Sequence, residues 1–179
     1  MLGLMQDWPL TVDRILDHAN SAFPRREVVT RGIESGALSR TNYANIWRRA
    51  KQVTNALRER GVQPGDRVAT LAWNTERHLE AWYGAMCMGA VLHTTNPRLF
   101  PEQIAWIINH AEDKILFFDT TFTPIVEKIA PLLKTVQTYV ALTDRDHVPK
   151  SSVAHFVAYE DFIHGHPQDA AWGGFDENT

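Results

Sequence analysis

The sequence is poor in cysteine, in long apolar runs and in targeting signals. Cys87 is the one cysteine in 179 residues, which excludes an internal disulfide and is typical of a reducing compartment. No stretch approaches the roughly 20 apolar residues that cross a bilayer, so we expect no transmembrane segment. The first ten residues lack the basic region and the apolar run of a secretory signal. The expected location is therefore the cytoplasm.

An excess of basic residues is also missing. Lysine and arginine total 18 against 21 aspartate and glutamate residues, so we expect no nucleic-acid partner. Apolar side chains are plentiful instead, at 44% of the chain, with six tryptophans and eight phenylalanines. A chain of this length and composition forms one globular domain with a substantial core and needs no disulfide.

Residues 61–99 have the pattern of one complete βαβ unit. A Pro-Gly-Asp turn precedes a mostly apolar run from Arg67 to Trp73, the pattern of a buried strand. The next helix has Asn74 and Thr75 as candidate caps, Gly89 as its stop, and a predicted core face of Leu79, Trp82, Tyr83 and Met86. A second strand then begins at Ala90. Parallel strands need such a helical crossover, so the middle of the protein is predicted to be a parallel sheet covered by helices.

Similar patterns predict the remaining elements. Strands are expected at residues 27–31, 37–41, 114–118 and 136–142, and helices at residues 11–22, 43–60, 101–111, 123–133 and 159–163. The first two strands form a hairpin with a solvent-exposed turn at residues 32–36, and Pro131 is expected to kink or end its helix. The predicted fold class is α/β: an open, Rossmann-like sheet of largely parallel strands flanked by helices, with a short N-terminal β-hairpin.

Periodicity also predicts which way two helices face. Thr11 is the expected cap of the first helix, whose predicted core face is Val12, Ile15, Leu16 and Ala19. On the helix at residues 43–60, we expect the basic side chains to point outward: Arg48, Arg49, Lys51, Arg58 and Arg60. Residues 164–179 carry no periodicity and predict a linker or loose tail.

Most motifs that would identify a reaction are absent. The sequence has no G-x-G-x-x-G loop and no G-x-S-x-G elbow. Gly84 and Gly89 have the spacing of a phosphate loop, but they lie inside and at the end of a predicted helix and no lysine follows. His164 and His166 have no nearby cluster of metal-binding residues, so we interpret them as an exposed loop. Cys87 lies on an apolar helix and is interpreted as a buried thiol.

One sheet edge carries a candidate ligand site. In open parallel sheets, ligands bind outside the carboxyl ends of the strands. The two strands of the βαβ unit end in Trp73-Asn74 and in His93-Thr94-Thr95-Asn96-Pro97. We take four polar residues of these ends as a candidate ligand-facing loop: Asn74, His93, Thr94 and Asn96. The same residues also suit a structural role in capping the next helix and holding the loop, and we favour that role.

The order of several segments resembles a known enzyme superfamily. Thr41-Asn42-Tyr43, then GVQPGDRVATLAWN, MGAVLHTTNPRL and EQIAWIINHAEDKILFFD are similar to the N-terminal part of the AMP-forming acyl-CoA synthetases, the adenylate-forming ligases. HTTNPRL followed by INHAEDKILFFD is most similar to the medium- and long-chain fatty-acid CoA ligases. The resemblance extends from about Leu10 to Ala158.

The resemblance implies a two-step reaction. A carboxylate attacks the α-phosphate of ATP and releases pyrophosphate, and the thiol of coenzyme A then displaces AMP from the acyl-adenylate. ATP, Mg²⁺ and coenzyme A are therefore the expected cofactors of the parent enzyme, and a fatty acid is its expected substrate. Members of the superfamily hold these groups with a Ser/Thr/Gly-rich loop and other motifs that this sequence does not contain. We assign no catalytic, cofactor-binding or metal-binding residue here and expect no cofactor in the fragment itself.

The resemblance also implies that this chain is a fragment. We expect residues 1–165 to be the N-terminal subdomain of an adenylation domain, and residues 166–179 to be a linker or tail that leads to the absent ATP-binding loop. The expected partners are the remainder of the parent enzyme and a second copy of the chain, because fatty-acid relatives often pair through their N-terminal regions. The fragment alone is expected to be inactive.

Two alternatives stay open. The chain is either a fragment of a superfamily member that adenylates a different acid, or a stand-alone α/β module that binds a ligand or partner and catalyses nothing. A coding sequence that continues into a Ser/Thr/Gly-rich loop excludes the stand-alone module, whereas a stop codon after Thr179 supports it.

Overall fold

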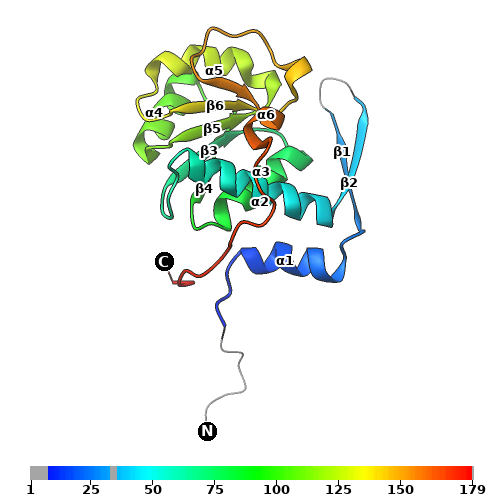
Figure 1. Cartoon of the computed structure of the whole chain (residues 1–179). Helices are drawn as coiled ribbons and strands as arrows, with labels where there is room; N and C mark the ends of the chain where they lie inside the picture. The colour runs from blue at the N-terminus through cyan, green and yellow to red at the C-terminus, as the bar shows by residue number, and fades with distance from the viewer. Residues whose placement is uncertain (1–7, 33–35, 179) are drawn as a thin grey trace.

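Five parallel strands form the main sheet of the computed structural model, which describes residues 8–32 and 36–178 (Figure 1). The strand order is β4-β3-β5-β6-β7, and every neighbouring pair is parallel. The strands are β3 (Arg67–Leu71), β4 (Val91–Thr94), β5 (Ile115–Phe118), β6 (Thr138–Ala141) and β7 (Phe156–Ala158). The predicted fold class is confirmed.

Strand β4 pairs in parallel with β3, as the βαβ pattern predicted. The pattern did not predict its place in the sheet: β4 is an edge strand and its Val91 is 50% exposed. The middle is taken by β5, whose four residues are all buried. A right-handed crossover fixes the direction of the next strand, but the short run Val91–Thr94 does not show on which side of the sheet it pairs.

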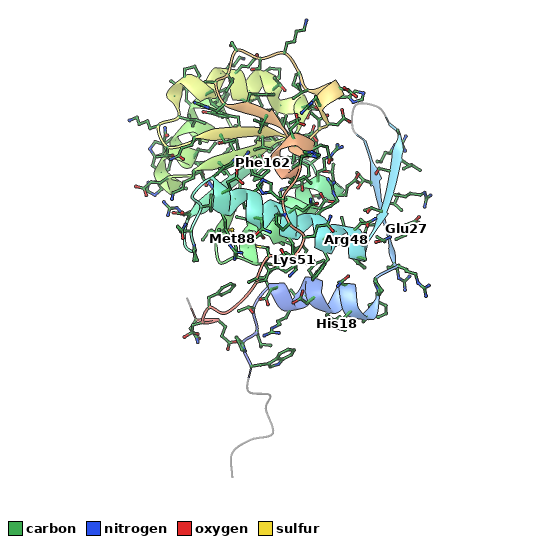
Figure 2. All side chains as sticks on the ribbon, viewed as in Figure 1. His18, Glu27, Arg48, Lys51, Met88 and Phe162 are labelled. Atoms are coloured by element: carbon green, nitrogen blue, oxygen red, sulfur yellow. The ribbon has the colours of Figure 1, made fainter. Side chains whose placement is uncertain are left out.

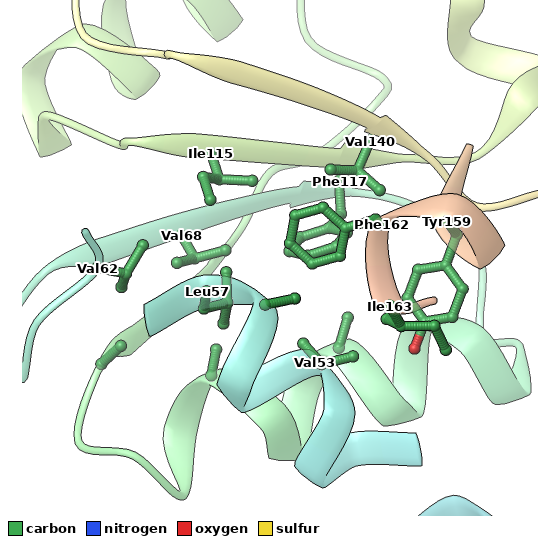
Figure 3. Packing of buried hydrophobic residues seen from close by; sticks show 14 of the residues in the cluster. Val53, Leu57, Val62, Val68, Ile115, Phe117, Val140, Tyr159, Phe162 and Ile163 are labelled. Atoms are coloured by element: carbon green, nitrogen blue, oxygen red, sulfur yellow. The ribbon is translucent and has the colours of Figure 1, made fainter. Parts of the chain in front are cut away.

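Helices cover both faces of the sheet. On one face lie α2 (Tyr43–Glu59), α3 (Glu76–Met86) and α6 (Tyr159–Ile163). Figure 3 shows the core between them and the sheet, where Leu57, Val68, Phe117 and Phe162 meet. The other face is covered by α4 (Pro101–Ala111) and α5 (Thr123–Ile129), which pack on Leu71, Leu116 and Phe118. The result is a three-layer α/β arrangement.

An antiparallel hairpin stands apart from the main sheet. Strands β1 (Glu27–Arg31) and β2 (Leu38–Asn42) pair only with each other among the described strands. The predicted second strand is displaced by one residue. Residues 33–35 of the predicted turn lie outside the described residues. Figure 1 shows the hairpin beside the ends of α2 and α3.

Helix boundaries follow local capping. The side chain of Asn42 accepts a hydrogen bond from Asn45 N at the start of α2, and that of Thr75 accepts one from His78 N at the start of α3. Gly61 and Gly89 take left-handed conformations just beyond these helices and end them, which for Gly89 confirms its predicted role as a stop. Helix α5 ends at Ile129 and a 3₁₀ turn follows over Ala130–Leu132, as Pro131 predicted.

The first helix, α1 (Asp13–Ala22), begins without a side-chain cap, so the predicted cap at Thr11 is wrong. Its N-cap residue is Val12. The predicted core face is only partly right, because Leu16 is buried against Ile46 and Ala50 of α2 whereas Ile15 is 61% exposed. A single helix packed on the outside of another needs only a narrow apolar stripe, and Leu16 provides it.

The buried face of α3 matches the prediction only in part, because Leu79 and Tyr83 pack, partly buried, against the cluster of Leu16, Ile46 and Ala50. The side facing the core consists of small and polar residues, namely Ala81, Ala85, Gly84, His78 and Glu80, while Trp82 is exposed. Helix α2 crosses so near that a Cβ built on Gly84 would lie 2.6 Å from Val53 Cβ and 2.8 Å from Ala50 O. Close packing of two helices selects small residues at their contact and displaces the large apolar ones toward the rim.

The C-terminal segment is not a loose tail, which corrects that prediction for residues 166–173. Lys51 donates to Ala170 O at 2.7 Å, Asn55 Nδ2 donates to Pro167 O at 2.9 Å, and Gly173 N donates to Cys87 O at 3.0 Å. Figure 2 shows Lys51 pointing from α2 toward this segment. Polar side chains of α2 thus hold this segment in place by hydrogen bonds, although its sequence has no periodic pattern. The boundary between the subdomain and the following segment at residue 165 stays a prediction.

Candidate functional site

The carboxyl ends of the parallel strands meet where the topology changes direction. Strand β3 pairs with β4 on one side and with β5 on the other. The first crossover leads from β3 to β4, and the next one returns past β3 to β5 on its other side. This strand order has its switch point between β3 and β5. In open α/β sheets, ligands bind outside the carboxyl ends of the strands at such a point.

A cavity of about 380 Å³ lies at this place. We call it the switch-point crevice. Its walls come from the hairpin, the first turn of α3 and the loops after β5 and β6: Thr30, Gly32, Ala37, Leu38, Ser39, Thr75, Glu76, Arg77, Asp119, Thr120, Leu142, Thr143, Asp144 and His147. It therefore joins segments that are far apart in sequence.

Carboxylates and hydroxyls dominate the polar lining of the crevice. Asp119 Oδ1 accepts hydrogen bonds from Thr121 N and Thr121 Oγ1, at 3.1 and 3.0 Å. Asp144 Oδ1 accepts one from His147 Nδ1 at 2.6 Å, which lowers the pKa of the Asp144 carboxyl. Ser39 donates to Glu76 Oε1 at 2.7 Å. These bonds fix the carboxylates in place but leave the crevice rich in acceptors.

An apolar hollow of about 330 Å³ adjoins the crevice between β1 and α3. Its lining includes Val29, Asn74, Leu79, Trp82 and His78. Burial lowers the pKa of the His78 imidazole. Its Nδ1 lies 3.0 Å from Trp73 O and its Nε2 lies 3.1 Å from Thr70 Oγ1, so both ring nitrogens have partners. His78 therefore has a structural role in holding the loop after β3.

A partly buried ionic network lies beside the crevice and joins α2, α3 and α6. Arg49 Nε donates to Glu80 Oε1 at 2.8 Å, and its two terminal nitrogens donate to Glu160 at 3.0 and 2.9 Å. Arg77 Nε donates to the same Glu160 carboxylate at 2.8 Å, and Tyr159 donates to Glu80 Oε2 at 2.8 Å. Two guanidinium groups thus face two carboxylates.

The two carboxylates of this network have opposite pKa shifts. Burial raises the pKa of Glu80, which is 1% exposed, to about 7. Burial also acts on Glu160, but the hydrogen bonds from Arg49 and Arg77 outweigh it and lower the pKa of that carboxyl. Arg77 in addition lines the crevice, so the network reaches the edge of the candidate site.

The predicted outward orientation of the basic residues on α2 is wrong at three positions. Arg49 belongs to the network, Lys51 lies over the rings of Trp47 and Trp172 at 4.3 and 4.6 Å, and Arg60 lies over Phe162 at 4.2 Å. Arg48 and Arg58 are exposed as predicted. The sequence contained a signal that Arg49 faces the core: it is three positions after Ile46 and four before Val53, so it lies beside the buried stripe of the helix.

The four candidate residues of the predicted ligand-facing loop do not come together. Asn74 lines the apolar hollow, and Thr94 is exposed at the end of β4. Asn96 Oδ1 accepts a hydrogen bond from Arg98 N at 3.0 Å and so holds its own loop. His93 Nδ1 lies 2.6 Å from Asp113 Oδ2, and this hydrogen bond raises the pKa of the imidazole. Their ligand role stays a prediction; their contacts are structural.

Other residues considered from the sequence have structural contacts as well. Gly84 allows the close crossing of α2 and α3, and Gly89 ends α3. The thiol of Cys87 is buried, which raises its pKa. No group of three or more histidine, cysteine, aspartate or glutamate side chains among residues 8–32 and 36–178 could hold a metal ion. No helix in the same ranges is long and apolar enough to cross a membrane.

Known proteins match this chain along most of its length. The family described as AMP-binding enzyme matches residues 16–172. The 3-methylmercaptopropionyl-CoA ligase of Ruegeria lacuscaerulensis is 42% identical over 180 residues, which are 100% of this chain and 33% of the relative. The long-chain-fatty-acid–CoA ligase of Thermus thermophilus is 46% identical over 159 residues, 89% of this chain and 28% of the relative. The chain spans about a third of the length of the curated relatives it matches.

Solved structures match the fold at lower sequence identity. An anthranilate CoA ligase in complex with anthranoyl-AMP superposes with a TM-score of 0.78 at 18% identity, over 94% of this chain and 30% of the other. A benzoate CoA ligase from Burkholderia xenovorans gives a TM-score of 0.74 at 17% identity, over 93% of this chain and 30% of the other. These two structures show the same fold as the described residues.

Proposed function

Since the chain belongs to the family of AMP-binding enzymes, as its segments predicted, we propose that it is the N-terminal part of an ATP-dependent, AMP-forming acyl-CoA ligase. One observation carries the proposal. The chain matches CoA ligases along 89 to 100% of its own length, whereas it accounts for only 28 to 33% of theirs. A part of this size that folds into a sheet with its own core supplies a scaffold for the parent enzyme.

The described residues do not fit a nucleoside triphosphate or its metal ion. Gly84 and Gly89, the two glycines with the spacing of a phosphate loop, are used for helix packing and for a helix stop. No metal-binding group is present in the described ranges either. We therefore propose that ATP, Mg²⁺ and coenzyme A bind to the remainder of the parent enzyme, and that this chain alone has no ligase activity.

A fatty acid is the proposed substrate class of the parent. Support comes from the relatives named for long-chain and medium-chain fatty acids, at 46% and 39% identity. A second candidate is a short thioether acid, because the relative named for 3-methylmercaptopropionyl-CoA matches the whole chain at 42% identity. Pairing of two copies and a cytoplasmic location are also proposals, which rest on the family resemblance and on the composition.

Two proteins test the function: the 179-residue chain and the product of the complete reading frame. Each is assayed for pyrophosphate release and acyl-CoA formation with butyrate, octanoate, palmitate, 3-methylmercaptopropionate and benzoate. We expect the complete product to be active, with one acid class preferred, and the 179-residue chain to be silent. A stop codon directly after Thr179 in the gene, or activity of the chain alone, would contradict the proposal.

Sedimentation of both proteins tests the proposed pairing. A mass that increases with concentration toward twice that of one chain supports a homodimer. A single-chain mass at every concentration for both proteins contradicts it.

A further inference from the structure

Strand β4 is an edge of the main sheet, and its outward main-chain groups have no strand to bind. The amides of Val91 and Thr95 donate to main-chain oxygens on the β3 side, both at 2.8 Å. Alternate residues of a strand face the same neighbour, so Leu92 and Thr94 direct their N–H and C=O groups away from β3. No strand within residues 8–32 and 36–178 pairs with them there.

This edge also lacks the features that usually protect one. Proteins guard an exposed edge with a charged side chain, a proline or a bulge, because an unpaired strand invites association with another. The four residues of β4, Val91–Thr94, include no proline, aspartate, glutamate, lysine or arginine. Their register with β3 is continuous, without a bulge. Such an edge is typical of a strand that is covered in the functional molecule.

The C-terminal segment leads to this edge. Figure 1 shows it running from α6 across α2, and Gly173 N then donates to Cys87 O just beyond the end of α3. The ring of Phe175 reaches Gly89, where an added Cβ would lie 3.3 Å from Phe175 Cδ1. Gly89 directly precedes Ala90 and the start of β4. Phe175 therefore lies beside the amino end of the open strand.

The path of this segment has the hand that parallel sheets require. The crossover from β3 to β4 passes over the face of the sheet that carries α3 and leads toward this edge. The path from β7 through α6 to Phe175 passes over the same face and leads in the same direction. A further strand beside β4 would thus be reached by a crossover of the same hand as β3-α3-β4, and such crossovers are right-handed in about 98% of cases.

We propose that the residues that follow Thr179 in the complete protein form a strand that pairs in parallel with the open edge of β4. Its main chain binds the outward groups of Leu92 and Thr94, and its side chains cover the half-exposed Val91. The inference rests on the proposed function, because a parent with the length of the relatives, of which this chain covers 28 to 33%, supplies the strand. A second copy of the chain is the alternative occupant that the test distinguishes.

Hydrogen exchange at single-residue resolution, compared between the complete protein and the 179-residue chain, tests the proposal. We expect the amides of Leu92 and Thr94 to exchange at least about tenfold more slowly in the complete protein, because only there do they donate to a partner strand. The amides of Val91 and Thr95 are internal controls, since they are bonded on the β3 side in both proteins. The 179-residue chain is measured at two concentrations, and protection that grows with concentration would instead assign the edge to a second copy.

A proline at position 92 gives an independent test. Leu92→Pro removes the outward N–H and places a ring in the path of the added strand, but it breaks no hydrogen bond to β3. Leu92→Ala is the matched control, because both variants lose the packing of the partly buried Leu92 side chain on the core. We expect the two variants of the 179-residue chain to unfold at similar temperatures. In the complete protein, Leu92→Pro should unfold several degrees below Leu92→Ala.

Three further results would overturn the proposal: fast exchange at Leu92 and Thr94 in the complete protein, equal protection in both proteins, or equal unfolding temperatures of the two variants in the complete protein. Ligase activity is a separate readout. An active complete protein with an open β4 edge would contradict the added strand alone, and an inactive one with a protected edge would contradict the ligase function alone. A stop codon directly after Thr179 would overturn both.

Discussion

The hydroxyl of Tyr159 donates a hydrogen bond to Glu80 Oε2 at 2.8 Å, across 79 positions of sequence. Both side chains are buried, and the other oxygen of Glu80 faces Arg49. This contact joins the one-turn helix α6 to the crossover helix α3. It places an ionisable group with an altered pKa in the middle of the packing between helices, so the stability of the fold depends on pH.

The pH dependence has a definite sign. Burial raises the pKa of Glu80 from 4.5 to about 7, so the folded state holds the proton more tightly than the unfolded state does. The contribution of Glu80 to stability is then complete below pH 4.5 and is lost as the pH rises through 7. Glu80→Gln removes this loss. We expect the free energy of unfolding of Glu80→Gln, relative to the unsubstituted chain, to rise by about 2 kcal/mol between pH 5 and pH 8.

Urea unfolding at several pH values measures this change. Glu102→Gln is the control, because Glu102 is exposed on α4 and has no ion pair with another described residue. A difference between Glu80→Gln and the unsubstituted chain that stays constant from pH 5 to pH 8 would contradict the assignment.

Removal of the arginine from the network should be costly. Arg49→Met leaves the buried carboxylate of Glu80 without its positive partner, and breaking a buried ion pair in this way costs about 3 to 5 kcal/mol. The double variant Arg49→Met/Glu80→Met should recover much of the loss, because two apolar side chains replace the pair. Arg48→Met, one position earlier and exposed, is the matched control. Additive losses in the double variant would mean that the two residues do not interact.

The helix crossing at Gly84 should tolerate no side chain. Gly84→Ala places a methyl group 2.6 Å from Val53 Cβ and 2.8 Å from Ala50 O, so α2 and α3 must separate. We expect a loss of about 2 to 3 kcal/mol in the free energy of unfolding, measured in urea. Helix propensity alone acts in the opposite direction, because alanine is favoured over glycine by about 1 kcal/mol. A stabilised Gly84→Ala chain would therefore show that the two helices do not pack as closely as described.

The C-terminal segment should detach when its aromatic anchor is removed. The indole N–H of Trp172 donates to Thr54 Oγ1 at 2.8 Å, and its ring lies over Lys51. For Trp172→Ala we expect a loss of about 2 kcal/mol and faster hydrogen exchange at Gly173 N, which is bonded to Cys87 O. Trp106→Ala is the control, since Trp106 is 63% exposed on α4. Unchanged exchange at Gly173 would mean that Trp172 does not anchor the segment.

The sequence predicted those elements whose periodicity and end signals agree. Helix α2 has a cap at Asn42 and a stop at Gly61, and β5 is a continuous apolar run, so both appear where they were expected. Strand β7 was missed because it has three residues and follows a polar loop. The edge position of β4 and the small-residue face of α3 depend on which elements pack together, and no local pattern contains that information.

The candidate site was only partly accessible from the sequence. The rule that ligands bind at the carboxyl ends of strands led to the end of the sheet where the crevice lies, and Asn74 lines the hollow beside it; that a ligand binds there stays a prediction. The crevice itself depends on the strand order, which places the loops after β5 and β6 opposite the hairpin. Thr143 and Asp119 belong to loops more than 20 residues apart, so their proximity has no signature in the sequence.

The anchoring of the C-terminal segment on α2 has a consequence for synthesis on the ribosome. Lys51, Thr54 and Arg49 of α2 find partners in residues 159–172, more than a hundred positions later. While the chain is growing, the guanidinium of Arg49 can pair with Glu80 but lacks its second carboxylate partner, and the surface of α2 that contacts Trp172 stays uncovered, until nearly all of these residues have left the exit tunnel. The helix that begins the core is among the last to be completed, and a chain that stops before Tyr159 should be retained by chaperones rather than released in a folded state.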